Sequence, residues 1–185
     1  MFGGFFVINV NEIAERAKEL GFSVAAPIDV STLELREDVR AACAENKCGK
    51  YGTNWGCPPG CGELEDLRKL ISNYKYGILV QTLGELEDEF DFETTIETGE
   101  KHNKLMQKIS SELSKEYSIL PLGAGPCQVC KNCAYPNPCV NEKHRVISME
   151  ALGLWVSGVC RKNNIDYYHG KGKLAFVGCI LIAEK

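Results

Sequence analysis

The chain has 185 residues, of which 44% are hydrophobic and 25% are charged, a composition typical of a globular domain with its own core rather than of a disordered chain. Its formal net charge is −4 and its isoelectric point is about 5.5. Because nucleic acids and anionic membranes bind basic surfaces, we expect neither as a partner.

The N-terminus is mostly apolar over residues 2–10, with no basic region before this run and with Asn11, Glu12 and Glu15 soon after it. Such a run is too short to span a membrane and lacks the basic start of a signal peptide. We therefore expect a cytoplasmic protein. In a reducing compartment, ten cysteines favour metal binding or redox chemistry over disulfides.

Apolar runs and helical periodicity alternate along the chain, which predicts alternating strands and helices. Strands are predicted over residues 5–10, 76–83, 119–122 and 174–183. The first predicted helix covers residues 12–20 and ends at Gly21, and it is followed by a helix bearing Leu35, Val39 and Cys43 and a helix bearing Leu64, Leu67, Leu70 and Ile71, all before the second strand. A long helix bearing Leu105, Ile109 and Leu113 precedes the third strand, and a helix bearing Leu152, Val156 and Cys160 precedes the last. This order predicts a single small α/β domain over residues 1–185, with a central mixed sheet flanked by helices.

Two of the helix starts are predicted from capping residues. Ser31 and Glu34 have the spacing of a capping box, which would begin the helix that carries Val39. Ser148 is a suitable N-cap for the helix that carries Val156.

Two long cysteine-rich loops separate these elements. The first cysteine loop covers about residues 43–62 and the second cysteine loop about residues 123–145. Loops of this length in a compact domain are usually functional, so both are candidate sites.

The second cysteine loop carries the stronger motif, C-x2-C-x2-C-x5-C, formed by Cys127, Cys130, Cys133 and Cys139. Three cysteines at this spacing let one tight loop wrap a cubane, with each thiolate reaching a different iron. The motif therefore predicts a 4Fe-4S cluster. In bacterial ferredoxins a proline follows the last cysteine, whereas here Pro138 precedes Cys139. Cys139 thus either completes this cluster or reaches a neighbouring one.

The first cysteine loop contains a second group with the spacing C-x4-C-x8-C-x3-C, formed by Cys43, Cys48, Cys57 and Cys61. Glycines between these cysteines allow close backbone approach, and Tyr51 and Trp55 are suited to shielding a cluster from water. We predict a second 4Fe-4S cluster here. If Cys43 or Cys61 is not a ligand, a cluster held by three cysteines would leave one iron open to substrate.

Zinc is the alternative cargo for both groups. Structural zinc is usually held by two separated C-x2-C pairs, which the evenly spaced cysteines of the second loop match less well. Cys160 and Cys179 lie within apolar segments and are expected to be core thiols, while His102 and His169 have no ligand-spaced companions and are expected to be solvated.

The sequence resembles a known family, the small cysteine-rich prokaryotic proteins described as predicted metal-binding proteins, which have a domain of unknown function. The matching residues are Val39-Arg40, Cys43, Cys48, Tyr51-Gly52, Trp55, Cys57-Pro58-Pro59, residues 123–127, Cys130, Cys133, Cys139 and residues 148–153. The resemblance implies a bound metal, with iron–sulfur as the expected form, and implies no particular reaction.

Eight acids and no Lys or Arg occupy residues 85–100. We expect a solvated loop here, and the alternative is a docking face for a basic redox partner protein.

Three functions fit these observations. The first is a redox module that passes single electrons between two 4Fe-4S clusters and a partner protein. The second is an iron–sulfur enzyme with an open iron, and the third is a zinc-stabilised binding or regulatory module. Motifs for dinucleotides, for a serine nucleophile and for a zinc protease are absent from the sequence.

Overall fold

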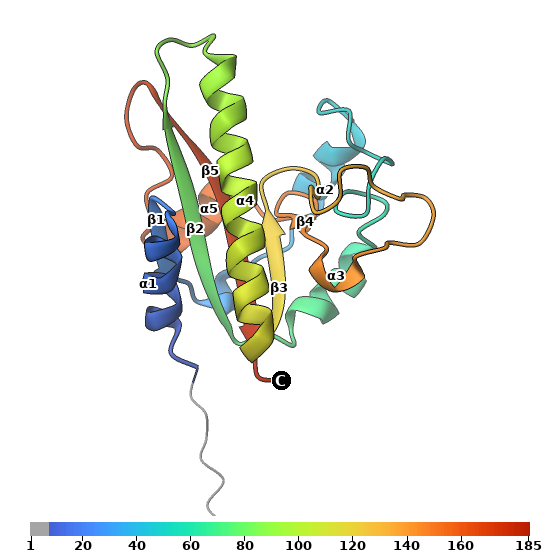
Figure 1. Cartoon of the computed structure of the whole chain (residues 1–185). Coiled ribbons are helices and arrows are strands. Elements are labelled where there is room, and N and C mark those ends of the chain that lie inside the picture. Colours follow the sequence, from blue (N-terminus) through green and yellow to red (C-terminus); the bar gives the residue numbers. More distant parts are fainter. Residues whose placement is uncertain (1–7) are drawn as a thin grey trace, which may run out of the picture.

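The computed structural model describes residues 8–185, which form a five-stranded sheet with helices packed on both faces (Figure 1). The strands are β1 (Val24–Pro27), β2 (Tyr76–Glu85), β3 (Ser118–Gly123), β4 (Ile147–Ser148) and β5 (Lys173–Ala183). Their order across the sheet is β1-β2-β5-β3-β4, in which β3 and β4 are parallel and the other neighbours are antiparallel. The predicted α/β fold with a mixed central sheet is therefore confirmed.

The described residues form five α-helices and two short 3-10 turns. The helices are α1 (Val10–Leu20), α2 (Glu37–Ala44), α3 (Leu64–Ile71), α4 (Phe92–Glu116) and α5 (Val156–Lys162), and the turns are η1 (Val30–Thr32) and η2 (Glu142–His144). Within this part of the chain, no helix combines the length and the apolar character that crossing a membrane requires.

The hydrophobic core is divided between the two faces of the sheet. Successive side chains of a strand point to opposite faces, so Ile78 and Val80 of β2 pack with α1 and α4, while Leu79 packs with α3 and α5. The same alternation places Ile180 of β5 in the first core and Cys179 in the second. Both central strands are thus covered on both sides, which explains their nearly continuous apolar sequence.

Most of the predicted elements are confirmed. The helix over residues 12–20 corresponds to α1, which ends where Gly21 adopts a positive φ of 116° and donates its N–H to the carbonyls of Ala17 and Lys18. The predicted strands over 76–83, 119–122 and 174–183 match β2, β3 and β5 within a few residues. Residues 5–7 of the predicted strand over 5–10 lie outside the described residues. The rest of this prediction is wrong, because Ile8 and Asn9 belong to no strand and Val10 begins α1.

The predicted capping box at Ser31 is wrong. Asp29 accepts hydrogen bonds from the Ser31 N–H at 2.9 Å and from the Ser31 Oγ at 2.7 Å, which fixes the turn η1 instead of a helix start. Leu35 then pairs with Leu154 in an isolated β-bridge, so the chain stays extended up to Arg36 and α2 begins at Glu37.

The predicted cap at Ser148 is also wrong, because Ser148 belongs to β4 and α5 begins only at Val156. Between them Gly153 has a φ of +87° and lies against the backbone of Arg36. A residue in this conformation ends a helical segment, which explains the short turn over residues 149–153 and the later helix start.

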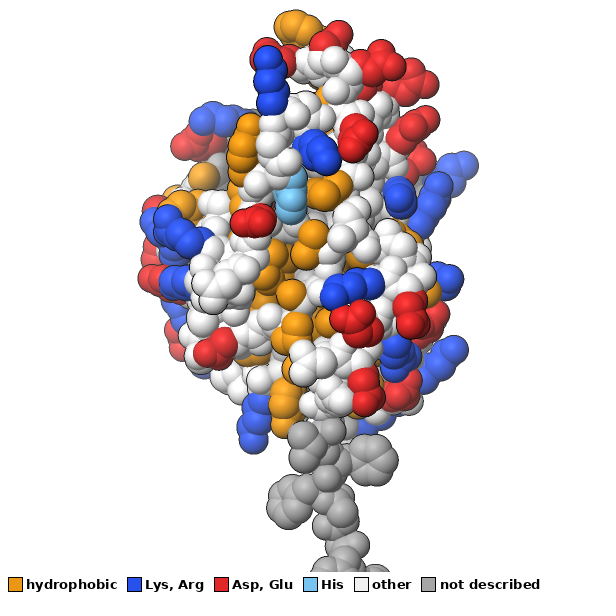
Figure 2. All heavy atoms as spheres, turned by 90° about the vertical axis from the view of Figure 1, so that its left-hand side faces the viewer, with side chains coloured by type: hydrophobic (Ala, Val, Ile, Leu, Met, Phe, Trp, Pro, Cys, Tyr) orange, Lys and Arg blue, Asp and Glu red, His pale blue; other side chains and the backbone are white. Residues whose placement is uncertain are grey.

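The acidic stretch continues into a helix, since Asp91 accepts a hydrogen bond from the Thr94 N–H at 3.0 Å and thereby caps α4. Figure 2 shows acidic side chains gathered at the upper end of the molecule, where Figure 1 places the turn between β2 and α4. Phe90 and Phe92 are exposed at this acidic turn, with exposed fractions of 76% and 68%.

Candidate metal centre

The two cysteine loops lie next to each other beside the same edge of the sheet (Figure 1). The first loop connects α2 to α3, and the second connects β3 to its parallel neighbour β4. The edge strand β4 joins them, because the Ser148 N–H donates to the Gly56 carbonyl at 3.0 Å and the Met149 N–H donates to the Gly123 carbonyl at 3.0 Å. Strand pairing at this edge therefore places one loop against the other.

Three cysteines of the first loop surround a cavity of about 240 Å³. Cys43, Cys48 and Cys57 line it together with residues of both loops and of the turn after β4, namely Lys50, Tyr51, Pro58, Gly125, Pro126, Ser148, Glu150 and Ala151. The wall is mostly apolar, and its charged side chains are Lys50 and Glu150. Three of the four predicted cysteines of the first group therefore lie around one cavity.

Cys61 occupies a different position. It is buried in the core on the α3 side of the sheet, with an exposed fraction of 4%, and it is not among the residues that line the cavity. Its sulfur accepts a hydrogen bond from the Arg40 guanidinium at 3.0 Å, and the same guanidinium donates to the carbonyls of Gly62 and Ala151. Arg40 thus fixes both the end of the loop and the orientation of Cys61.

The electrostatics of the first loop oppose free thiolates. Burial raises the pKa of Cys57 to about 11, and neighbouring cysteines add to this effect. Burial is also the main cause that raises the pKa of Cys43, and the charge of Glu150 acts in the same direction while Arg40 opposes it. At Cys43 burial outweighs the charge of Arg40, so a bound metal would supply the additional positive charge that a thiolate needs there.

All four cysteines of the second loop line one smaller cavity, and they are Cys127, Cys130, Cys133 and Cys139. Its volume of about 20 Å³ has room for about one water molecule. Asn141 Nδ2 donates a hydrogen bond to Cys130 Sγ at 3.0 Å, a contact typical of the protein groups that tune cluster sulfurs. The predicted set is therefore brought together, and the loop must widen to admit a cluster.

Each cavity is lined in part by residues of the other loop. Trp55 of the first loop lines the cavity of the second, and its Nε1–H donates to the Asn137 carbonyl at 2.9 Å. Its ring also meets Tyr135 edge-to-face, with ring centres 5.1 Å apart. In the opposite direction, Gly125 and Pro126 of the second loop line the cavity of the first. The two groups of cysteines are thus neighbours in space although about 80 residues separate them.

Within residues 8–185, no three His, Cys, Asp or Glu side chains are arranged to hold a single metal ion. A tetrahedral zinc ion would draw four sulfurs to within about 4 Å of one another. Here three thiols line one cavity and four line another.

The remaining cysteines and histidines lie elsewhere. Cys160 and Cys179 are fully buried in the core, as predicted. His102 is also fully buried, so the expectation that it is solvated is wrong, and His169 is partly buried with its Nε2 2.7 Å from Gln81 Oε1. Their tertiary contacts, which the spacing along the sequence does not reveal, decide these positions.

Three side chains that contact the site were not selected as functional from the sequence: Arg40, Glu150 and Asn141. A local signal existed for Arg40, which precedes Cys43 by one helical turn, and for Asn141, which follows Cys139 by two residues. Glu150 lies far along the chain from the first loop, so only the tertiary structure places it on that cavity.

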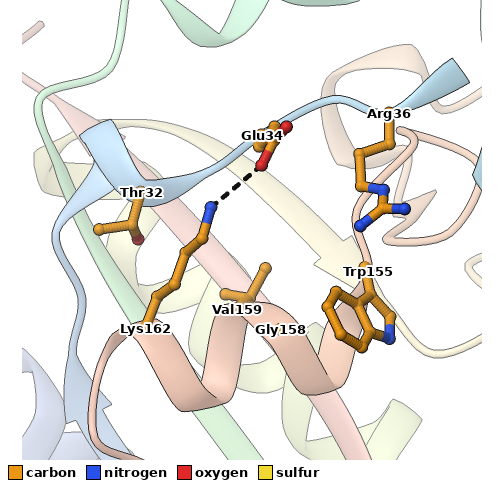
Figure 3. Close-up of a pocket in the computed structure, with 7 residues that line it drawn as sticks. All are labelled: Thr32, Glu34, Arg36, Trp155, Gly158, Val159 and Lys162. Carbon is orange, nitrogen blue, oxygen red and sulfur yellow. Dashed lines mark hydrogen bonds and ion pairs between the residues drawn. The ribbon is translucent and has the colours of Figure 1, made fainter.

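A separate pocket of about 70 Å³ lies between the segment before α2 and helix α5 (Figure 3). Arg36 and Arg161 both contact the Trp155 ring, at 5.3 and 4.9 Å from its centre, and Lys162 pairs with Glu34 at 3.1 Å. These contacts attach the segment to α5, and no cysteine lines this pocket.

A family model described as predicted metal-binding protein (DUF2284) matches residues 26–182. The matched range includes both cysteine loops and all five strands, apart from the first two residues of β1 and Ala183 at the end of β5. Comparisons with curated proteins and with solved structures gave no match.

Proposed function

Because the chain belongs to the family of predicted metal-binding proteins, we propose that its two cysteine loops bind two 4Fe-4S clusters and that the protein is an electron-transfer module. The observation that carries the proposal is that three cysteines of the first group line one cavity, all four of the second group line another, and each cavity is also lined by residues of the other loop. Bound there, each cluster would take up and release one electron.

The contact between the two loops supports a transfer role. Trp55 of the first loop and Tyr135 of the second pack edge-to-face across this contact. Asn141 donates a hydrogen bond to a sulfur of the second group, and such bonds stabilise the more negative, reduced state of a cluster. Two adjacent sites of this kind allow an electron to enter at one loop and leave at the other.

A redox partner protein completes the proposal, and we place the protein in the cytoplasm, where free thiols are maintained. The partner should dock at the cysteine loops rather than at the acidic turn. Gln107 of α4 donates to the Gln128 carbonyl of the second loop at 3.1 Å. Phe92 begins the same helix 15 residues earlier, which is about 22 Å away along its axis.

The experiment is an anaerobic purification in which iron, zinc and acid-labile sulfide are counted per chain, followed by a redox titration of the visible spectrum. We expect about eight irons with matching sulfide and reversible bleaching on reduction. Cys57→Ser and Cys130→Ser should each lower the count to about four, while Cys160→Ala, which removes a thiol outside both cavities, should leave it unchanged.

Zinc without sulfide would contradict the proposal and favour the zinc-stabilised module. About four irons in the wild type would overturn the assignment of two clusters. A full set of clusters with no reversible reduction would remove the electron-transfer role while leaving the cluster assignment intact.

A further inference from the structure

The cavity of the first cysteine loop has three thiols on its wall rather than four. The sulfur of Cys61 is held in the core by the Arg40 guanidinium at 3.0 Å. If Cys61 faced the cavity, this half-buried guanidinium would lose one of its three acceptors. Moving an acceptor away from a half-buried charged donor is unfavourable, so the hydrogen bond from Arg40 favours the observed position of Cys61.

A carboxylate also lines this cavity. Glu150 lines the cavity, and its charge acts on the nearby Cys43 thiol. Ser148, which is 5% exposed and lines the same cavity, donates its hydroxyl to Glu150 Oε2 at 2.7 Å. A hydrogen bond from a buried group to a carboxylate is the usual support of a metal-binding carboxylate, because it fixes the direction of the free oxygen.

The backbone around Glu150 is also fixed. The Leu152 N–H donates to the Ser148 carbonyl at 2.9 Å, and the Gly153 N–H donates to the Glu150 carbonyl at 2.9 Å. These bonds form the tight turn after β4, and β4 itself is paired with β3. Glu150 is therefore presented to the cavity from the rigid sheet edge, and not from the long loop that carries the three cysteines.

We propose that Glu150 is the fourth ligand of the cluster in the first cysteine loop, in place of Cys61. This inference rests on the proposed function, since it needs a cluster in that cavity. A carboxylate oxygen is a harder donor than a thiolate, so the iron that it binds differs from the other three and exchanges its ligand more readily. The first cluster would then contain one distinct iron, while the second, with four thiols on its cavity, would not.

The first measurement uses the wild-type protein. Reconstituted with ⁵⁷Fe, it should show one iron in about eight with a Mössbauer signal distinct from the rest. In Glu150→Cys the iron count should stay the same and the distinct signal should disappear, because all ligands become thiolates. In Glu150→Gln about one iron per chain should be lost, while Glu63→Gln, which changes an exposed carboxylate outside the cavity, should behave as the wild type.

Cys61→Ala supplies the opposite test and should keep both clusters and the distinct signal. A loss of iron in Cys61→Ala together with an unchanged count in Glu150→Gln would overturn the inference and assign Cys61 as the ligand, with the proposed function intact. A wild-type spectrum without a distinct iron would overturn it as well, independently of any variant. A wild type without iron and sulfide would instead overturn the proposed function, and this inference with it.

Discussion

His102 shows how a single residue is set by its tertiary surroundings. It is fully buried on α4, and its ring centre lies 5.7 Å from that of Phe22 and 6.2 Å from that of Phe176. Its Nδ1 is 2.9 Å from Thr82 Oγ1, and within residues 8–185 its Nε2 has no hydrogen-bond partner. Burial lowers its pKa from 6.5 to about 4, because a buried imidazolium would lose its hydration.

Acid should therefore destabilise the protein through His102. The pKa is lower in the folded state, so the unfolded chain binds the proton first and the free energy of unfolding falls as the pH drops from about 6.5 to about 4. The shift corresponds to roughly 3 kcal/mol at the acid end of this range. Urea unfolding between pH 4 and pH 7 should show a weaker pH dependence in His102→Gln than in the wild type. The same dependence in both proteins would contradict this assignment.

The thiols should differ in reactivity when no metal is bound. Cys48 and Cys133 are exposed. Burial raises the pKa of Cys57 from its ordinary value of 9.0 to about 11, so the thiolate fraction of Cys57 is about 100-fold lower than that of an ordinary cysteine. Cys160 and Cys179 are fully buried. With iodoacetamide at pH 8 and peptide mass spectrometry, we expect the two exposed cysteines to react first and the two core cysteines last. Early labelling of Cys179 would show that the core opens.

At the scale of elements, the contact between the two cysteine loops depends on Gly56. A Cβ built on this residue would lie 2.8 Å from Cys127 Cβ and 2.9 Å from the Cys127 backbone nitrogen, closer than real contacts allow. Its carbonyl also accepts the hydrogen bond from Ser148 of β4. Glycine is therefore required for the first loop, the second loop and the sheet edge to meet at one point.

Gly56→Ala should push the loops apart. We expect a loss of about 1–3 kcal/mol in the free energy of unfolding, the usual cost of overpacking, together with a lower cluster content. Gly49→Ala is the control, because Gly49 has a positive φ of 67° but open space around the added Cβ, so only a backbone cost of about 1–2 kcal/mol applies. Denaturant unfolding and iron counts check both variants. If Gly56→Ala lost no more iron than the control, the metal sites would not depend on this contact between the loops.

At the scale of the whole molecule, the sheet and its two cores are largely independent of the metal sites. The core on the α1 and α4 side contains no cysteine, and the core on the other side contains Cys61, Cys160 and Cys179 but none of the cysteines that line the two cavities. The cysteine loops are mostly turns and irregular segments. The folded domain should therefore persist without metal, while its loops loosen.

Removing the metal should change the loops more than the fold. We expect the far-UV circular dichroism of the metal-free protein to stay close to that of the loaded protein and its unfolding to remain one cooperative transition. Trypsin should cleave the metal-free protein first after the exposed Lys50 and Lys131, and these sites should be protected in the loaded protein. Separate unfolding transitions, or early cleavage within α4, would contradict a single domain with metal-dependent loops.

The sequence alone determined the elements whose signal is local. Neighbouring residues are enough to predict the apolar runs of β2 and β5, the end of α1 at Gly21 and the spacing of both cysteine groups. They are not enough to predict the starts of α2 and α5, because the Leu35–Leu154 bridge and the turn at Gly153, which has a positive φ, override favourable caps.

Only the tertiary structure decided how the site is assembled. The pairing of β4 with β3 brings the second loop against the first, and the turn after β4 places Glu150 on a cavity whose cysteines are about 100 residues away. The bond to Arg40 directs Cys61 into the core although its spacing suits a ligand. Spacing along a chain specifies which thiols are available, whereas packing and buried hydrogen bonds select those that face a common cavity.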